Sequence, residues 1–279
     1  MKLSTQAVRR NIIERFRVEH GDKPIARLAR SHIKEIIGAK ANTPEGANNL
    51  LKVLRLILNY AVSIDLIPSN PTIGIKKYRS TNPDGIHTFT EDEVAQFIAR
   101  HSVCTEAHLA LTVFLCTGQR KSDVVRKGWQ HIRNGKIAVR QEKTNTPLLI
   151  PIHPDLEQAL AATSRTNLTL LVTTYGKPFS VSGFGNWFRD RCDEAGLQQC
   201  SSHGLRKLAA TRLAQVGCSE REIMAITGHK SLSEVSRYTK AADQSRLAEQ
   251  AMAKLTTART NMDERLSSTP TPLDKTASK

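Results

Sequence analysis

The residues with the clearest chemical potential lie between residues 202 and 239 of this 279-residue chain. His203 and Arg206 are three positions apart, so one turn of a helix brings them to the same face. Gly228-His229 follows after a second predicted helix, and Tyr238 comes nine residues later on a third. A phenol can attack a phosphodiester while cationic and hydrogen-bonding groups hold the phosphate oxygens. The segment has neither the order of a Ser-His-Asp triad nor the spacing of a metal site.

This set of residues resembles the catalytic box of the tyrosine recombinases, the phage integrase family. The resemblance rests on His203-Gly-Leu-Arg206, Gly228-His229 and Tyr238. The family also has an upstream arginine in a Gly-x-Arg-x-Ser-Asp/Glu setting, matched by Gly118-Gln-Arg120-Lys-Ser-Asp123, and a hairpin lysine, matched by Lys143. The similarity covers roughly residues 86 to 250 and extends more weakly to the N-terminus. Any one of these positions would be a weak signal, whereas together and in this order they are specific.

The resemblance implies a site-specific DNA recombinase, of phage or mobile-element origin, in which Tyr238 is the nucleophile. Its attack gives a 3′-phosphotyrosyl link and a free 5′ hydroxyl. Arg120 and Arg206 neutralise the phosphate with donors that stay protonated at any working pH. His229 adds a donor. No metal is expected, because the arginines take the electrostatic role of a metal ion. No ATP or other cofactor is expected, because the phosphotyrosyl link keeps the bond energy.

Three supporting roles follow from the same comparison. His203 either donates to the phosphate or helps to move the Tyr238 proton, since a free phenol with a pKa of about 10 is a poor nucleophile at neutral pH. Lys143 protonates the departing 5′ oxygen, a role for which Lys136 is the less favoured candidate. Asp123, three residues after Arg120, is expected to pair with that guanidinium and fix it for phosphate contact.

Two other functions use the same features. A type I topoisomerase would employ the same residues to relax supercoiled DNA without sequence choice. A non-catalytic DNA-binding protein is the other, because the chain begins almost at a helix start and its N-terminal module looks shorter than in the family. A helix–turn–helix over residues 203 to 228 fits the pattern too, but it leaves Arg120 and Tyr238 unexplained.

The composition favours a polyanionic partner. Lys and Arg total 41 against 26 Asp and Glu, giving a net charge of +15 and a pI near 9.9, which is typical of nucleic-acid-binding proteins. We therefore predict double-stranded DNA as the partner, a homo-oligomer such as a tetramer on paired sites, and accessory DNA-bending or directionality proteins. Candidate DNA contacts outside the catalytic set are Lys76, Lys77, Arg79, Lys121, Arg189 and Lys207.

The sequence also predicts a cytoplasmic, nucleoid-associated protein. No stretch approaches the roughly 18 consecutive apolar residues of a membrane span, and the N-terminus lacks the apolar core of a secretion signal. The five cysteines are odd in number and contain no Cys-x-x-Cys pair, so reduced core thiols are the favoured interpretation.

The elements that must position the site predict a mainly α fold with a small β-sheet (α+β). Residues 1–79 form a helical core-binding domain, 80–86 a linker, 87–257 a mixed, mostly helical catalytic domain of tyrosine-recombinase type, and 258–279 a disordered tail. Trp129 to His153 is the only predicted sheet, with a hairpin turn at Asn134-Gly135. Capping boxes are predicted at Thr90–Glu93 and Ser219–Glu222. The apolar run 168–172 fits a strand or a buried helix.

Further helices are predicted from apolar periodicity and from capping and stop signals. The last of them, 243–255, has one apolar face; in the family this helix docks onto a neighbouring subunit, and packing within the same chain is the alternative. The predicted helices are 4–19, 24–38, 43–67, 106–116, 124–127 (capped by Ser122 or Asp123), 154–162, 182–194, 203–216, 219–228 and 243–255.

Overall fold

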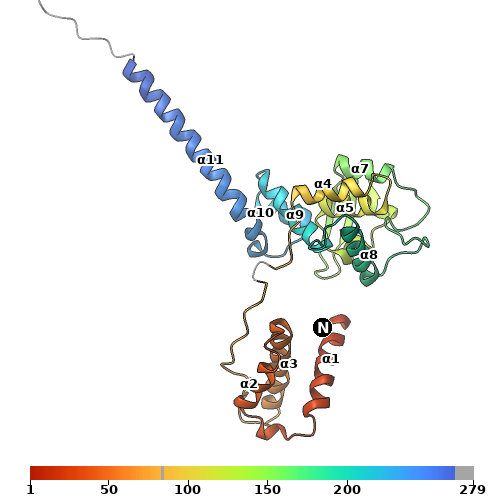
Figure 1. Cartoon of the computed structure of the whole chain (residues 1–279), viewed down its shortest axis with the longest axis vertical. Helices are drawn as coiled ribbons and strands as arrows, with labels where there is room; N and C mark the ends of the chain where they lie inside the picture. Colours follow the sequence, from red (N-terminus) through yellow and green to blue (C-terminus); the bar gives the residue numbers. More distant parts are fainter. Residues whose placement is uncertain (83–84, 268–279) are drawn as a thin grey trace, which may run out of the picture. The chain divides into compact units, whose positions relative to one another are not determined.

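The computed structural model describes residues 1–82 and 85–267. The chain divides into two compact units, Met1–Gly85 and Ile86–Lys279. Each unit has its own hydrophobic core. Figure 1 shows the helices of the first unit and the mixed architecture of the second. Within the described residues, none of the helices combines the length and apolar character that a membrane crossing requires.

The regular secondary structure described in the first unit is all helical, and residues 64–82 are turns and irregular chain. The core of this unit is the apolar face of α3 packed against α2, with Ile33, Leu51 and Leu58 fully enclosed. The predicted second helix is interrupted: Leu28 and Ala29 are extended, and α2 starts only at Arg30 because the His32 ring accepts the backbone N–H of Ala29 and caps the new helix. The elements of this unit are α1 (Leu3–His20), the 3-10 turn η1 (Ile25–Arg27), α2 (Arg30–Gly38) and α3 (Pro44–Ser63).

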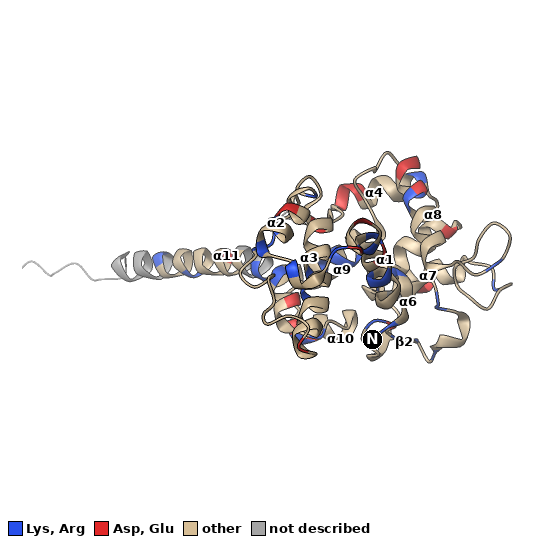
Figure 2. Ribbon diagram, turned by 90° about the horizontal axis from the view of Figure 1, so that it is seen from below, with Lys and Arg blue, Asp and Glu red and all other residues tan. Residues whose placement is uncertain are grey.

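The second unit is built around α5, which is apolar on all sides and contacts both α7 and α9. Both predicted capping boxes are confirmed. Thr90 and Glu93 exchange side-chain-to-backbone hydrogen bonds at the start of α4, and Ser219 and Glu222 do the same at α10. Figure 2 shows the acidic residues of α4 in red. The helices of this unit are α4 (Glu91–Arg100), α5 (Glu106–Thr117), α6 (Lys121–Val124), η2 (Trp129–His131), α7 (Pro154–Ala161), α8 (Val181–Glu194), α9 (Ser202–Gln215), α10 (Glu220–Thr227) and α11 (Leu232–Ser267).

The predicted sheet is a three-stranded antiparallel sheet in the order β1 (Ile132–Arg133), β2 (Lys136–Arg140) and β3 (Pro147–Pro151). Asn134 and Gly135 both have positive φ, which the tight β1–β2 turn requires. Alternate residues of β2 are buried, so one face of the sheet packs on the core. The run 168–172 is neither strand nor helix: it makes isolated bridges at Thr169 and Val172. Leu170 and Leu171 are buried from this irregular segment, whereas Leu168 is 80% exposed.

The C-terminal part departs most from prediction. The helix carrying Tyr238 and the separately predicted helix 243–255 are one continuous helix, α11, whose first part packs on α9 and α10 (Figure 1). This helix runs to Ser267 and so includes the first ten residues of the predicted tail; residues 268–279 lie outside the described residues. The physical reason is that residues 232–267 contain neither Gly nor Pro, the two residues that most readily end a helix.

Candidate active site

Five segments of the second unit supply the predicted catalytic residues. Arg120 stands at the start of α6, and Lys143 lies in the turn between β2 and β3. The other four are on or beside the C-terminal helices: His203 and Arg206 on α9, His229 after α10 and Tyr238 on α11. The α5–α6 connection depends on Gly118, which has φ of 58° and whose added Cβ would lie 2.9 Å from a methyl of Thr227. A larger residue there would push apart the two segments that carry Arg120 and His229.

Arg206 is the most enclosed of these side chains, being only 3% exposed. Its Nη1 donates to the backbone oxygens of Gly118 (2.5 Å) and Thr227 (2.9 Å). Among the described residues its Nη2 is buried without a hydrogen-bond partner. Burial, and next the charge of Arg120, lower the pKa of Arg206 to about 10, so it remains charged at neutral pH. A fixed guanidinium with one uncommitted donor is suited to hold a phosphate oxygen.

Arg120 is held by the buried amide of Gln141. Arg120 Nη1 donates to Gln141 Oε1 (3.0 Å), which also accepts from the Thr144 hydroxyl (2.7 Å). The amide nitrogen of Gln141 donates to Gln119 Oε1 (2.7 Å) and to Thr227 O (2.8 Å). One fully buried side chain therefore joins Arg120, the hairpin that carries Lys143 and the segment before His229.

His229 is neutral at physiological pH. Burial, and then the charge of Arg206, lower its pKa to about 4. Its Nδ1 lies 2.7 Å from the Thr227 hydroxyl, which is also 2.7 Å from the backbone oxygen of Ile223. The hydroxyl has one hydrogen. Donated to the Ile223 oxygen, it leaves Thr227 to accept from Nδ1–H; donated to Nδ1, it leaves the proton on Nε2, the tautomer that can donate to a phosphate. Thr227 thus couples the tautomer of His229 to the end of α10.

His203 and Lys143 are within electrostatic reach of each other. Partial burial, followed by the positive charges of Arg206, Lys207, Arg120 and Lys143, lowers the pKa of His203. A neutral imidazole can accept a proton, so this environment is compatible with the proton-moving role as well as with donation to phosphate.

Tyr238 is half-buried on α11, with its ring packed against a small cluster that includes Ala210, Ala214 and Ile223. Its ring centroid is 6.1 Å from that of His229. Burial raises the pKa of Tyr238, and the charge of Arg206 works in the opposite direction. The phenol is therefore protonated at rest and close to the guanidinium that would stabilise its ionised form.

A cavity of about 430 Å³ opens beside these groups. Arg120, His203 and Arg206 line it together with Lys121 and Arg189, and none of its lining residues is a carboxylate. Lys and Arg residues also lie along α9 (Figure 2). A cavity with cationic walls is suited to an anionic ligand, and a phosphodiester is the class that this spacing of donors can accommodate.

Of the remaining predicted site residues, some have hydrogen-bond partners within the chain and others are exposed. Lys207 donates to the backbone oxygen of Ile86 (2.7 Å) and Arg189 to that of Gln198 (2.8 Å), so both have intramolecular partners. Lys76, Lys77 and Arg79 are exposed in the first unit, on the segment that precedes Gly85. The predicted Lys136 alternative is exposed on β2.

The predicted pairing of Asp123 with Arg120 is wrong. The Asp123 Oδ1 accepts the backbone N–H of Glu142 (2.7 Å), and its Oδ2 is buried without a partner in the described residues. Asp123 is thus turned toward the hairpin and not toward the guanidinium of Arg120, which Gln141 holds instead. The predicted cap is wrong as well: α6 begins at Lys121 with Arg120 at the N-cap position, because Val124 N and Asp123 N already bond to the Arg120 carbonyl.

The sequence pattern of the phage integrase family matches residues 87–245, more than half of the 279 residues. The chain belongs to the phage integrase family. It is 24% identical over 246 residues to the integrase of Escherichia phage HK022, with 84% of this chain and 67% of that protein covered. The chain spans about two thirds of the length of the relatives it matches.

Solved structures of this family have the same fold. A lambda integrase dimer bound to a COC′ core site has a TM-score of 0.76 at 22% identity, covering 86% of this chain and 72% of that one. A lambda integrase tetramer bound to a Holliday junction has a TM-score of 0.74 at 22% identity, covering 84% and 74%. The predicted fold class, mainly α with a small sheet and a catalytic domain of tyrosine-recombinase type, is confirmed.

Two residues that support this site were not predicted from the sequence: Gln141 and Thr227. Each has a signal that is visible only beside the motifs, since Gln141 precedes the hairpin lysine by two positions and Thr227 precedes Gly228-His229. Gly228 explains their closeness, because a Cβ at this position would lie 2.4 Å from the Gln141 amide nitrogen.

Proposed function

We propose that this protein is a site-specific DNA recombinase that cleaves and rejoins DNA strands through a 3′-phosphotyrosyl intermediate. The observation that carries the proposal is the buried Nη2 of Arg206, a donor without a partner among the described residues, beside a cavity lined by cations. A buried guanidinium nitrogen without a partner is costly, and a phosphate oxygen would satisfy it. Tyr238 lies next to this guanidinium, as their mutual influence on pKa indicates.

In the proposed reaction the Tyr238 oxygen attacks phosphorus while the bond from phosphorus to the 5′ oxygen breaks. The phenol proton passes to a neutral histidine, for which His203 is the candidate, and Lys143 gives a proton to the departing 5′ oxygen. Arg120, Arg206 and His229 hold the phosphate oxygens as negative charge grows on them. A second 5′ hydroxyl reverses these steps on the phosphotyrosyl link. The bond energy is kept throughout, so the reaction needs no nucleotide cofactor, and the cationic cavity leaves no electrostatic role for a metal ion.

The partners of the reaction belong to the same proposal. Double-stranded DNA is the substrate, contacted by Lys121, Arg189 and Lys207 near the site and by Lys76, Lys77 and Arg79 from the first unit. Lambda integrase forms a tetramer on a Holliday junction, and we extend a tetramer on paired sites to this chain. Its contact would be α11, where Leu247, Met252 and Leu255 are each more than half exposed. Accessory DNA-bending or directionality proteins complete the assembly, which acts at the nucleoid in the cytoplasm.

The test of this function is covalent trapping with EDTA present. Nicked duplexes that tile the DNA flanking the gene are incubated with the full chain, and adducts are resolved under denaturing conditions. We expect a denaturant-resistant adduct that forms on a small number of duplexes only. Salt-sensitive binding without an adduct would instead assign a DNA-binding protein, and equal adducts on every duplex a topoisomerase.

Thr227→Val is expected to slow adduct formation by about 10- to 100-fold. The change keeps the two methyl-sized branches that pack near Gly118, but it removes the hydroxyl that sets the His229 tautomer. Losing a buried hydrogen bond costs about 1–3 kcal/mol, and each 1.4 kcal/mol in a barrier is about a factor of ten in rate. Single-turnover cleavage as a function of pH measures the effect.

Thr227→Ser is the matched control, since it restores the hydroxyl and loses a methyl. We expect it to recover most of the rate and the pH profile of the natural protein. If the Val variant retains both the natural rate and the natural profile, Thr227 does not position His229.

A further inference from the structure

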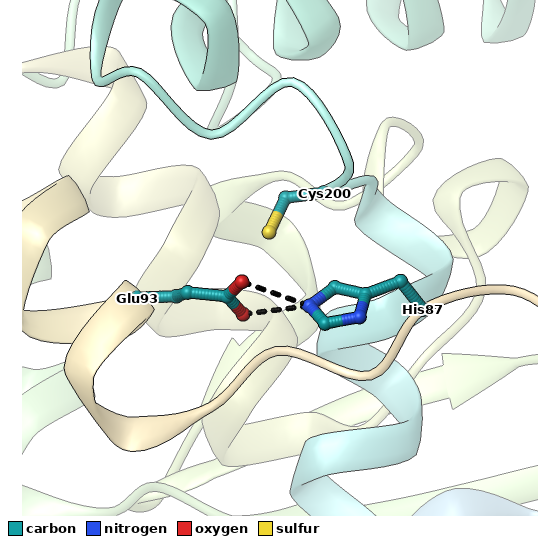
Figure 3. A group of neighbouring side chains, drawn as sticks. All are labelled: His87, Glu93 and Cys200. Atoms are coloured by element: carbon teal, nitrogen blue, oxygen red, sulfur yellow. Dashed lines mark hydrogen bonds and ion pairs between the residues drawn. The ribbon is translucent and has the colours of Figure 1, made fainter.

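Outside the active site, three side chains with metal-ligating atoms meet in the second unit: His87, Glu93 and Cys200. Their ligand atoms all lie within 4.8 Å of one another. They come from three separate segments, the start of the unit, the first turn of α4 and the loop before α9, and Figure 3 shows them pointing toward one centre. We propose that this cluster binds one zinc ion, or a divalent transition metal of similar chemistry.

The donor set matches zinc chemistry. An imidazole nitrogen, a thiolate sulfur and a carboxylate oxygen are the three ligand types that zinc accepts in proteins. Two of them are anionic when coordinated, which neutralises the charge of the ion in a partly buried place. Cys200 is fully buried and the Glu93 side chain is 13% exposed, whereas the His87 side chain is 36% exposed and leaves a path from solvent. A fourth position can be filled by water from that side.

The distances need adjustment in both directions, because the three ligand atoms span up to 4.8 Å while the imidazole and the carboxylate are in hydrogen-bond contact. The His87 Nε2 atom lies 2.9 and 2.8 Å from the two Glu93 oxygens, which is an ion-pair or hydrogen-bond distance. With zinc bonds of about 2.0–2.3 Å in a tetrahedral arrangement, ligand atoms stand roughly 3.3–3.6 Å apart. Separating the imidazole and the carboxylate by about half an ångström therefore makes room for the ion. The ion binds the lone pair of Nε2 while the neutral imidazole carries its proton on Nδ1, and the thiol proton leaves to solvent as the thiolate coordinates.

The ligands are already oriented by their surroundings, as good metal ligands are. Glu93 accepts hydrogen bonds from the Thr90 backbone N–H (2.8 Å) and from the Gln199 amide (2.6 Å). Although burial alone would raise the pKa of Glu93, its hydrogen bonds lower it to about 2, so the carboxylate is ionised and available.

The backbone of His87 is fixed as well. A Cβ on Gly204 of α9 would lie 2.4 Å from the His87 carbonyl oxygen, so the two backbones are in close contact. Lys207 of the same helix donates to the neighbouring Ile86 carbonyl (2.7 Å). A bound ion would therefore join the first residues of this unit to the segment that leads into α9, three residues before His203. Its expected role is structural, to hold the start of this helix, and it is separate from the phosphodiester chemistry.

The test uses the full chain, stripped of metal by a chelator and dialysed free of it. Zinc alone is titrated in competition with a chromophoric chelator, and cobalt(II) is added separately because a thiolate ligand gives it a near-ultraviolet charge-transfer band. We expect one tight site per chain, the thiolate band with cobalt, and a higher Tm with zinc. Cys200→Ser, His87→Gln and Glu93→Gln should each weaken zinc binding by at least about tenfold.

Cys104→Ser is the control, since Cys104 is exposed and is not one of the three cluster residues. It should keep the affinity, the band and the Tm shift. Glu93→Gln retains a capping-box residue at the start of α4, so a loss of zinc binding there is not explained by unfolding. An unchanged zinc affinity in all three cluster variants, or a cobalt band that persists in Cys200→Ser, would overturn the proposal. None of these readouts requires strand-transfer activity.

Discussion

Tyr238→Phe is expected to abolish covalent adduct formation while leaving DNA binding and folding nearly intact. The change removes one oxygen, the atom that would bond to phosphorus, so we expect no residual adduct formation. The ring itself stays packed on Ala210, Ala214 and Ile223, and a half-buried hydroxyl contributes little to that packing. We expect the free energy of unfolding to change by less than about 1 kcal/mol.

The measurement is the same denaturing assay, run beside a salt titration of DNA binding. Tyr175→Phe is the matched control, because Tyr175 lies in the same unit and is 86% exposed. It should form adduct at the natural rate. Adduct formation by the Tyr238→Phe protein would assign the nucleophile to another residue and remove the basis for the role of α11 in the reaction.

The elements predicted well are those set by local signals. Both capping boxes and the Asn134-Gly135 turn are confirmed, because each depends on residues three or fewer positions apart. The continuous helix α11 was missed even though its sequence lacks any stop signal, since the apolar periodicity used to define its parts is weak there. Leu247 and Leu255 of the predicted helix 243–255 are exposed, so its apolar face is not covered by the described part of the chain.

In the candidate site, too, the features set by local sequence were predicted and those set by contacts between distant segments were not. The residue types and order of the motifs identified the groups that the second unit brings together around Arg206. The support of these groups could not be predicted, because it depends on contacts between distant segments. Gln141 bonds to Gln119, 22 positions away, and to Thr227, 86 positions away. The predicted pairing of Arg120 with Asp123 was reasonable from spacing alone, but this buried Gln141 side chain supplies the partner instead.

Arg206→Lys is expected to reduce the single-turnover cleavage rate by about 10²- to 10³-fold, the usual effect of removing one donor that stabilises developing charge. A lysine keeps the positive charge but has one compact ammonium in place of a planar fork. It cannot bond the backbone oxygens of Gly118 and Thr227 and still present a free nitrogen to the phosphate. Electrostatic attraction to DNA should therefore persist while the oriented contact is lost.

The same substitution should also destabilise the fold, by about 1–3 kcal/mol for a buried acceptor left without its donor. The Gly118 oxygen is the one at risk, because Thr227 O still accepts from Gln141. Denaturant unfolding separates this effect from catalysis, and Arg221→Lys, an exposed change on α10, is the control. A rate that falls only in proportion to the folded fraction would make Arg206 a structural residue. A rate loss at full folding, with DNA affinity retained, would show that the free guanidinium nitrogen acts on the phosphate.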